Sequence, residues 1–552
     1  MPKFILTLLC QLFIIQSFGQ NDYSFHPPVK IPIYLSGNFG EIRSDHLHSG
    51  IDIKTQGTIG HRVYAIEEAY VSRIKVQANG YGKSIYLAHP NGLTSVYGHL
   101  DRYREDIAEF VKNMQYKRRS HSVDLYLKPH QFNLSKGDFI AYSGNTGSSS
   151  GPHLHFEIRS TGNQHPGNVL KYNFKIEDRV APRFKSLQVY PLDKSSHVNR
   201  TSRGHSTTLV KDKGIYTIPF GTGINASGKV GLSVEVFDYL NGANKRCGVY
   251  ILEMYVNEKL TYKHVLEEFS FSETRYINAH INYEERIRSG VLAHRLHRLP
   301  NDRLRIYKTL DRDGILQINE NKKYDIRLVA TDVAGNRSEC KFTLSGDMKI
   351  PMQSSPPPHF VKTMKFNESN HFEMEGVKVE IPAYALYKDL DFTFEKLPAI
   401  KESLTAFYHI ATAENPVHLP YTLSIKSPLK DPSLLDKLLM ITMNDEHEVK
   451  AAGGSYHDGT MVASLRTFGS YALALDTIAP EIIFLNGTAN ADLTGKKSLR
   501  FIIRDKLSGI DKYEGYIDNQ WVLFEYDLKN DLLSYTFDNN RLTKGSKHEL
   551  EL

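Results

Sequence analysis

The sequence predicts a mostly β protein: an N-terminal antiparallel β domain with a helical insertion, followed by immunoglobulin-like and other β-sandwich domains. Three observations support this fold class. The chain has 552 residues, which is too long for one hydrophobic core. Its 32 Tyr and 27 Phe residues occur in runs rich in Val, Ile and Thr, which favour strands. Short alternating apolar segments recur between turn residues.

Composition excludes several classes of protein. Apolar residues make up 40% of the chain and charged residues 24%, which is typical of a soluble globular protein. The net charge of +6 is small for this length, so it favours adhesion to an anionic surface but predicts no nucleic-acid partner.

Residues 1–20 have the pattern of a signal peptide. Lys3 supplies the positive end, residues 4–15 are apolar, and residues 17–19 place small side chains at a cleavage site. No later segment is apolar enough to cross a membrane. We therefore expect an exported chain that is periplasmic, attached to the cell surface or secreted.

Residues 21–175 are predicted to form the first folded domain. The Asn91-Gly92 turn between two short alternating segments predicts a β-hairpin. An insertion is expected at about 102–135, and its residues 102–116 are expected to be helical because their apolar residues have helical spacing. Those residues are Ile107, Phe110, Val111 and Met114.

A divergent internal repeat relates residues 176–345 to residues 476–552. The segment 178–182 (Asp-Arg-Val-Ala-Pro) recurs at 476–480 (Asp-Thr-Ile-Ala-Pro). In each copy a later strand runs into an aspartate that is followed four residues on by glycine. Both copies are predicted to be immunoglobulin-like domains, the second being shortened or incomplete.

The two copies are separated by a linker and a further domain. Residues 346–360 contain three consecutive prolines and predict a stiff, extended linker. Residues 361–475 alternate like strands and predict another β-sandwich. Cys247 and Cys340 are compatible with a disulfide and equally with two buried free thiols.

Two clusters of histidine and aspartate carry the chemistry. In an extended segment His48 and Asp52 project from the same face, and Gly50 between them would leave room for a bulky ion. His153 and His155 lie in a strictly alternating segment, so both imidazoles project from one face of a strand.

Zinc-dependent hydrolysis would require these residue types. A hydrolytic zinc site takes three protein ligands from His, Asp and Glu and keeps a fourth position for water. Further imidazoles can accept the proton of that water or stabilise the tetrahedral intermediate. Each cluster alone is a weak signal, but their combination predicts a metal site.

Three separated motifs occur in order: the His-x-Gly-x-Asp pattern at 48–52, Tyr-Gly-His-Leu at 97–100, and Gly-Pro-His-Leu-His-Phe-Glu at 151–157. Together with residues 38–43, they resemble the lysostaphin-type (LytM-like) zinc metallopeptidases, which are peptidoglycan endopeptidases. The resemblance covers about residues 35–160, less than a third of the chain.

This resemblance implies a site residue by residue. One zinc ion per chain would be held by His48, Asp52 and His155, and the catalytic histidines would be His99 and His153. The implied activity is zinc-dependent hydrolysis of peptide cross-links in peptidoglycan, with zinc-bound water as the nucleophile. The implied partners are the wall peptide itself and cell-envelope proteins.

Two alternatives share the same residues. The first is a non-catalytic scaffold of this fold that activates other wall hydrolases. The second is a protease that acts on proteins rather than on cell wall. The insertion departs from the family pattern, and we expect it to serve as a lid or as a partner-docking helix.

Other polar residues receive structural interpretations. His46 matches no family position and is interpreted as a surface residue or as one that supports the ligands from outside. The histidines of the later domains are expected to be solvated. The segment 332–336 (Asp-Val-Ala-Gly-Asn) is interpreted as a structural turn rather than a calcium site.

Overall fold

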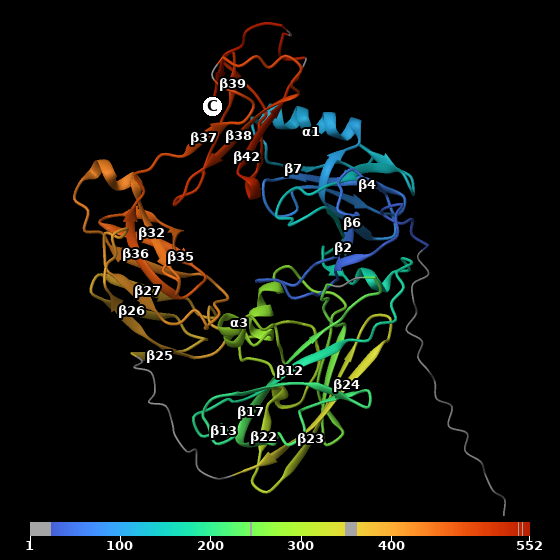
Figure 1. Cartoon of the computed structure of the whole chain (residues 1–552), viewed down its shortest axis with the longest axis vertical. Helices are drawn as coiled ribbons and strands as arrows, with labels where there is room; N and C mark the ends of the chain where they lie inside the picture. Colours follow the sequence, from blue (N-terminus) through green and yellow to red (C-terminus); the bar gives the residue numbers. More distant parts are fainter. Residues whose placement is uncertain (1–23, 243–244, 348–360, 489, 539, 544) are drawn as a thin grey trace, which may run out of the picture.

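The computed structural model describes residues 24–242, 245–347, 361–488, 490–538, 540–543 and 545–552. The predicted signal peptide and most of the predicted Pro-rich linker lie outside these residues. The described part is dominated by strands, so the mostly β fold class is confirmed (Figure 1). No helix in it is long and apolar enough to cross a bilayer.

The N-terminal domain is built on a mainly antiparallel sheet with the order β1-β2-β10-β6-β5-β4-β7. The strands are β1 (Leu35–Gly37), β2 (Ile51–Lys54), β4 (Ala69–Val76), β5 (Lys83–Ala88), β6 (Leu93–Tyr103), β7 (Val123–Tyr126) and β10 (His153–Ser160). Smaller strands flank this path, namely β3 (Arg62–Tyr64), β8 (Asn133–Leu134), β9 (Phe139–Ser143) and β11 (Pro166–Gly167). The Asn91-Gly92 turn joins β5 to β6, as the hairpin signal predicts.

The insertion is only partly helical. Its helix α1 (Glu105–Arg118) buries Ile107 and Val111 against the core of the domain. The rest of the insertion contributes β7 and β8, which both pair with β4. Strand β7 therefore extends the sheet at the edge opposite β1 and β2. The helical spacing identified α1, but the short strands after it gave no clear signal.

The second unit is a large sheet interrupted by short helices. Its main path contains β14 (His205–Thr208), β12 (Arg183–Pro191), β17 (Ile224–Phe237), β24 (Arg337–Gly346), β23 (Lys323–Thr331), β18 (Ile251–Val256), β19 (Lys259–Val265) and β21 (Tyr307–Leu310). Its other elements are β13 (His197–Val198), β15 (Val210–Asp212), β16 (Ile215–Thr217), α2 (Ile277–His280), α3 (Tyr283–Ser289), β20 (His294–Arg295) and β22 (Leu316–Ile318).

Residues 361–475 form two five-stranded sheets that share one buried core. The first contains β26 (Asn370–Met374), β27 (Val377–Ile381), β31 (Tyr421–Lys426), β35 (Thr460–Leu465) and β34 (Ser455–His457). The second contains β29 (Phe394–Leu397), β30 (Phe407–Ile410), β36 (Gly469–Leu475), β32 (Leu438–Met443) and β33 (Val449–Gly453). A short pair, β25 (Lys362–Met364) and β28 (Leu390–Phe392), completes this unit.

The C-terminal unit repeats part of the second unit. Its strands are β37 (Glu481–Phe484), β38 (Ser498–Arg504), β42 (Leu532–Thr536) and β41 (Glu525–Asp527), with β39 (Tyr516–Ile517), β40 (Gln520–Trp521) and β43 (Leu550–Glu551) in a separate sheet. β37 pairs with β38 as β12 pairs with β17, and in both cases the first residue of one strand lies opposite the last residue of the other. The domain boundaries given by the sequence analysis remain predictions.

The N-terminal domain lies between the second unit and the C-terminal unit (Figure 1). The C-terminal unit docks on α1, where Tyr116 and Trp521 meet edge to face at 5.4 Å between ring centroids. Lys112 pairs with Asp538 at 2.6 Å across the same contact. Helix α1 therefore serves as a docking helix for another part of this chain.

The two described cysteines do not form a disulfide. Cys247 and Cys340 are both buried free thiols. They cannot pair because Cys247 packs in the core of the N-terminal domain, whereas Cys340 packs in the core of the second unit.

Replacing Tyr116 by Ala should weaken this docking. Trp521 is the only tryptophan of the chain, and its fluorescence emission should move to longer wavelength as the indole gains water. Loss of the aromatic pair should cost about 1 kcal/mol. The control is Tyr126→Ala, which removes a largely exposed tyrosine of β7. Equal emission spectra for the two variants would contradict the contact.

Candidate metal centre

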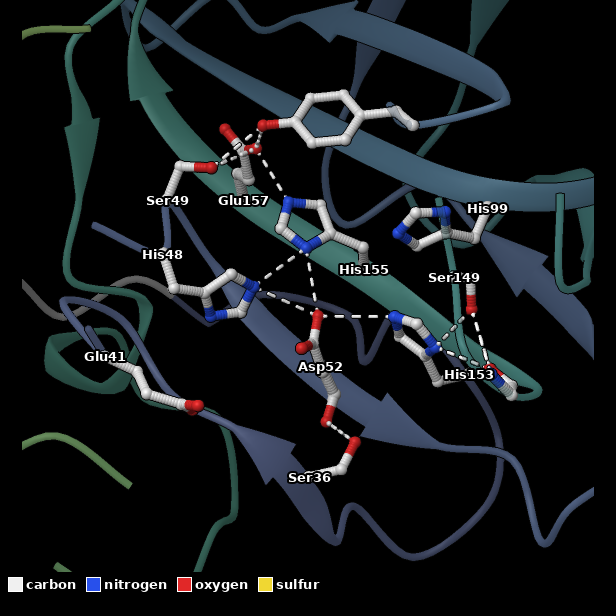
Figure 2. A network of polar contacts seen from close by, with 12 residues as sticks. Ser36, Glu41, His48, Ser49, Asp52, His99, Ser149, His153, His155 and Glu157 are labelled. Atoms are coloured by element: carbon white, nitrogen blue, oxygen red, sulfur yellow. Dashed lines mark hydrogen bonds and ion pairs between the residues drawn. The ribbon is translucent and has the colours of Figure 1, made fainter. Parts of the chain in front are cut away.

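Three adjacent strands build the candidate site. β10 pairs with β2 on one side and with β6 on the other, so that His155 lies opposite Asp52 and opposite Gly98. The loop before β2 brings His48 to the same place (Figure 2). The register of these three strands therefore assembles residues that are about one hundred positions apart.

Three ligand atoms converge at the centre of this site. The Nε2 of His48 lies 3.1 Å from Oδ1 of Asp52 and 3.1 Å from Nδ1 of His155. The distance from Nδ1 of His155 to Oδ1 of Asp52 is 3.0 Å. Ligand atoms of a tetrahedral zinc ion are separated by about 3.3 Å, given bonds of about 2.05 Å. The spacing therefore suits a small cation.

The outer nitrogens of the two imidazoles fix their orientation. Nδ1 of His48 donates to the backbone carbonyl of Asn38 at 2.8 Å, and Nε2 of His155 donates to Oε1 of Glu157 at 2.7 Å. Carbonyl and carboxylate oxygens only accept, so these nitrogens carry the protons. In a neutral ring the inner nitrogen then presents its lone pair to the centre, as metal ligation requires.

Charge at the centre also favours a cation. Burial raises the pKa of Asp52, but its electrostatic and hydrogen-bond interactions with His48, His153 and His155 outweigh burial and hold it well below its usual value. Burial similarly opposes protonation of His155, yet hydrogen bonds to Asp52 and Glu157 raise its pKa to about 9. The space between these two carboxylates thus favours positive charge, supplied by a proton on His155 or by a metal ion.

Glu157 anchors a second layer of contacts behind His155. Its side chain is fully buried and accepts hydrogen bonds from Arg159 at 2.6 Å, Tyr81 at 2.5 Å and Ser49 at 2.8 Å. Burial raises the pKa of Glu157, but Arg159 and His155 lower it further than burial raises it. The carboxylate is therefore ionised and can hold the outer N–H of His155.

His99 and His153 stand beside the three ligand atoms. Their ring centroids are 4.7 Å apart, and Nε2 of His153 lies 3.4 Å from Oδ1 of Asp52. Nδ1 of His99 donates to the carbonyl of Thr146, and Nδ1 of His153 donates to that of Gly151, both at 2.8 Å. Burial, with the neighbouring His155 and His153, lowers the pKa of His99 to about 3, so this ring is neutral.

The backbone at His99 has an uncommon conformation. Its φ of 56° lies in the left-handed region, which a β-carbon disfavours. Such strain persists only where surrounding contacts hold it, and it concentrates at functional sites.

The structure brings all five predicted site residues together and leaves His46 outside. His46 is half-exposed and pairs with Asp45 at 2.9 Å. The predicted role of Gly50 is wrong. A β-carbon there would lie 2.3 Å from the carbonyl oxygen of Phe156 and 2.7 Å from a side-chain carbon of Glu157. Gly50 allows β10 to approach closely and does not provide space for an ion.

Sequence reasoning missed the partners of the ligands. Glu157 had a signal, because residues 155, 157 and 159 alternate onto one face of β10. Asn38 lies in the segment 38–43 that forms part of the resemblance, but no pattern indicated its role, and Tyr81 had no signal, since both roles arise from contacts between distant segments.

The expectation that the later histidines are solvated is wrong for His197 and His297, which are both buried, and for one group of three. His264, His280 and His294 are buried and offer nitrogen atoms within 4.8 Å of one another. His280 and His294 are 3.0 Å apart between Nε2 and Nδ1, and Tyr307 contacts the other nitrogen of His280. They come from β19, α2 and β20, so no sequence spacing linked them.

Comparison with known families supports the N-terminal assignment. Residues 46–116 and 116–166 match the family described as Peptidase family M23. Residues 361–476 match the Zu5-like domain, and residues 282–403 match a family described as Protein of unknown function (DUF3238). All five site residues fall within 46–166.

Curated relatives resemble the same part of the chain. The DD-carboxypeptidase/endopeptidase Mpg of Neisseria meningitidis serogroup B is 31% identical over 117 residues, which are 21% of each chain. An uncharacterized metalloprotease of Haemophilus influenzae is 33% identical over 116 residues, covering 21% of this chain and 19% of the relative. The chain thus spans about a fifth of the length of these relatives.

Two solved structures are also similar. The catalytic domain of the M23 protein EnpA from Enterococcus faecalis, solved as a point mutant, is 21% identical, with 26% of this chain and 95% of that chain covered and a TM-score of 0.20. The catalytic domain of lysostaphin from Staphylococcus simulans is 24% identical, with 26% and 84% covered and a TM-score of 0.17. The family match and the curated relatives confirm the resemblance of the N-terminal domain to these metallopeptidases.

Replacing Gly50 by Ala should destabilise the N-terminal domain. The new methyl group would meet backbone of β10, so the strands must separate, at a cost of about 1–3 kcal/mol. The control is Gly162→Ala, because a β-carbon at Gly162 would meet nothing within 4 Å. Thermal unfolding of both variants measures the difference. A Gly50→Ala protein as stable as this control would contradict the close approach.

Proposed function

We propose that the chain is a zinc-dependent endopeptidase that hydrolyses peptide cross-links of bacterial peptidoglycan. One observation carries the proposal: His48, Asp52 and His155 converge beside His99 and His153, inside the segment that matches peptidase family M23.

The donor set favours zinc over other common ions. Two imidazole nitrogens and one carboxylate oxygen are the ligands of hydrolytic zinc sites, and three protein ligands leave a position for water. Magnesium and calcium prefer more oxygen ligands. We therefore assign one zinc ion per chain to His48, Asp52 and His155. The ionised Asp52 and the inward lone pairs of both histidines fit this assignment.

A bound zinc ion would lower the pKa of its water and polarise the scissile carbonyl. The chain's own residues handle the protons. The Nδ1 atoms of His99 and His153 donate to backbone carbonyls, which leaves Nε2 of each ring for proton transfer, and in the neutral His99 this Nε2 is an acceptor. These atoms can take a proton from the attacking water and return it to the leaving amine. Glu157 and Asn38 keep the ligand imidazoles oriented.

The substrate and location are inferred from chemistry and relatives. The DD-carboxypeptidase/endopeptidase name of the Neisseria relative supports a peptidoglycan peptide as substrate. A net charge of +6 favours contact with an anionic wall. The predicted signal peptide supports export to the periplasm, the cell surface or the medium. Cell-envelope proteins remain the proposed class of protein partner.

The scaffold alternative is less well supported. An inactive scaffold needs none of the five site residues, whereas here all five are present and oriented by further contacts. The main argument for the scaffold was that the insertion would cover the site as a lid. In the structure the insertion extends the edge of the sheet opposite β2, and its helix α1 contacts the C-terminal unit. A protease acting on proteins would use the same residues, so a substrate test separates it.

Digestion of purified peptidoglycan tests the proposal directly. The full chain should release the peptides of cross-linked dimers, detected by chromatography and mass spectrometry. A zinc chelator should abolish this activity, and added zinc should restore it. Casein serves as the protein substrate. Cleavage of casein without loss of cross-links would favour the alternative protease, and no cleavage of either substrate by zinc-loaded protein would favour the scaffold.

Alanine substitutions should separate ligands from catalytic residues. His48→Ala and His155→Ala should lose both zinc and activity. His99→Ala and His153→Ala should keep zinc and lose about 10²–10⁴-fold in turnover. His46→Ala is the matched control and should retain zinc and activity. Zinc content by mass spectrometry and turnover are measured together; a zinc-free His99→Ala protein would contradict the division of roles.

A further inference from the structure

We propose that Asp178, Asp238 and Asp332 form a second metal site, which binds a calcium ion where the N-terminal domain joins the second unit. Each residue offers one carboxylate oxygen, and these oxygens lie within 4.8 Å of one another. The three aspartates come from the segment before β12, the end of β17 and the turn after β23. This binding site does not depend on the proposed peptidase activity.

The burial of Asp238 is the observation that points to a ligand. Its side chain is only 2% exposed, and its Oδ1 is buried without a hydrogen-bond partner. A desolvated carboxylate oxygen with no partner is costly. No lysine or arginine within the described residues forms a salt bridge with any of the three aspartates. A cation would supply the missing partner.

The carboxylates repel one another in the absence of that cation. Burial, together with the charges of Asp332 and Asp178, raises the pKa of Asp238 to about 8. The pKa values of Asp178 and Asp332 are also raised, chiefly by burial. The cluster must therefore either hold protons or hold a cation.

Local contacts fix two of the carboxylates in place. The backbone N–H of Asn336 donates to Oδ1 of Asp332 at 2.8 Å, and its side-chain amide donates to Oδ2 at 2.8 Å. The same amide donates to the backbone carbonyl of Asp178 at 3.2 Å. The N–H of Val180 donates to Oδ1 of Asp178 at 3.0 Å. The turn at 332–336 thus holds the first and third aspartates together.

The second copy of the repeat provides an internal comparison. Asp505 follows β38 as Asp238 follows β17, but Oδ1 of Asp505 accepts hydrogen bonds from the N–H groups of Leu507 at 2.9 Å and Gly509 at 3.0 Å. The counterpart of Asp178 accepts from the N–H of Ser508. No third carboxylate joins them in the described residues. In the second copy, nearby N–H groups satisfy the carboxylate of Asp505. In the first copy, Oδ1 of the equivalent Asp238 has no hydrogen-bond partner.

The ligand chemistry selects calcium. Three carboxylates without nitrogen or sulfur donors suit a hard cation. Calcium–oxygen bonds of about 2.3–2.6 Å allow ligand oxygens up to about 5 Å apart, whereas tetrahedral zinc needs about 3.3 Å. The three carboxylate oxygens all lie within 4.8 Å of one another, inside the limit for calcium, and the choice of calcium rests on the all-carboxylate donor set. Water or backbone carbonyls would complete its coordination.

The position of the site connects it to the candidate metal centre. The backbone of Asp238 exchanges two hydrogen bonds of 2.9 Å with Cys247. The next residue, Gly248, exchanges hydrogen bonds of 2.7 and 2.8 Å with the side chain of Asn38. The carbonyl of Asn38 in turn accepts from His48. Calcium would thus stabilise the segment that orients His48.

Calcium titration of the full chain tests the proposal. Protein freed of metal and reloaded with one equivalent of zinc should bind one calcium ion with a dissociation constant on the order of 10⁻⁴ M. Saturating calcium should raise the midpoint of thermal unfolding by several degrees. Asp238→Asn should abolish both effects, whereas the matched variant Asp505→Asn should retain them.

The unfolding temperature with and without calcium provides a second readout. An aspartate with only a structural role would not show the reversal expected here. Without calcium, and at a pH above about 8 where Asp238 is ionised, Asp238→Asn should unfold at a higher temperature than the parent chain, because it removes a repelling charge. With calcium the order should reverse. Unfolding of the parent chain that does not respond to millimolar calcium, or an equal response in Asp238→Asn, would overturn the proposal.

Discussion

The alignment of β10 with β2 and β6 is the constraint on which the candidate site depends. His155 faces Asp52 across one neighbour and Gly98 across the other. Side chains alternate along a strand, so a shift of one residue would turn both histidines of β10 into the core. The close approach at Gly50 enforces this alignment, because only a residue without a β-carbon lets the loop before β2 reach the backbone of Phe156.

Much of this arrangement could be predicted from local sequence patterns. Strict alternation placed His153 and His155 on one strand face, and the order of three motifs brought His99 to them. The Asn91-Gly92 turn predicted the hairpin that carries His99. These predictions succeeded because each depends on a periodicity or turn preference that acts over a few residues. The same reasoning found α1 but not β7 and β8, whose few residues carry little pattern.

Contacts between distant segments were beyond prediction from one sequence. Asn38 is held by Gly248, 210 residues further along the chain, and Trp521 meets α1 from the C-terminal unit. The buried histidines of β19, α2 and β20 were expected to be solvated because hydropathy assigns polar residues to the surface. Gly50 was misread for a related reason: the sequence shows a small residue, whereas only the structure shows which neighbouring strand needs the space.

These long-range contacts make the second unit part of the candidate metal centre. A ligand histidine works only if its outer nitrogen is oriented, and for His48 that task belongs to the carbonyl of Asn38. Both polar atoms of the Asn38 side chain are engaged by Gly248, so the second unit sets the position of that carbonyl. Leu47, next to the ligand, also donates its N–H to Thr274 of the same unit. The second unit therefore constrains the orientation of His48, and an isolated N-terminal domain would lack both of these contacts.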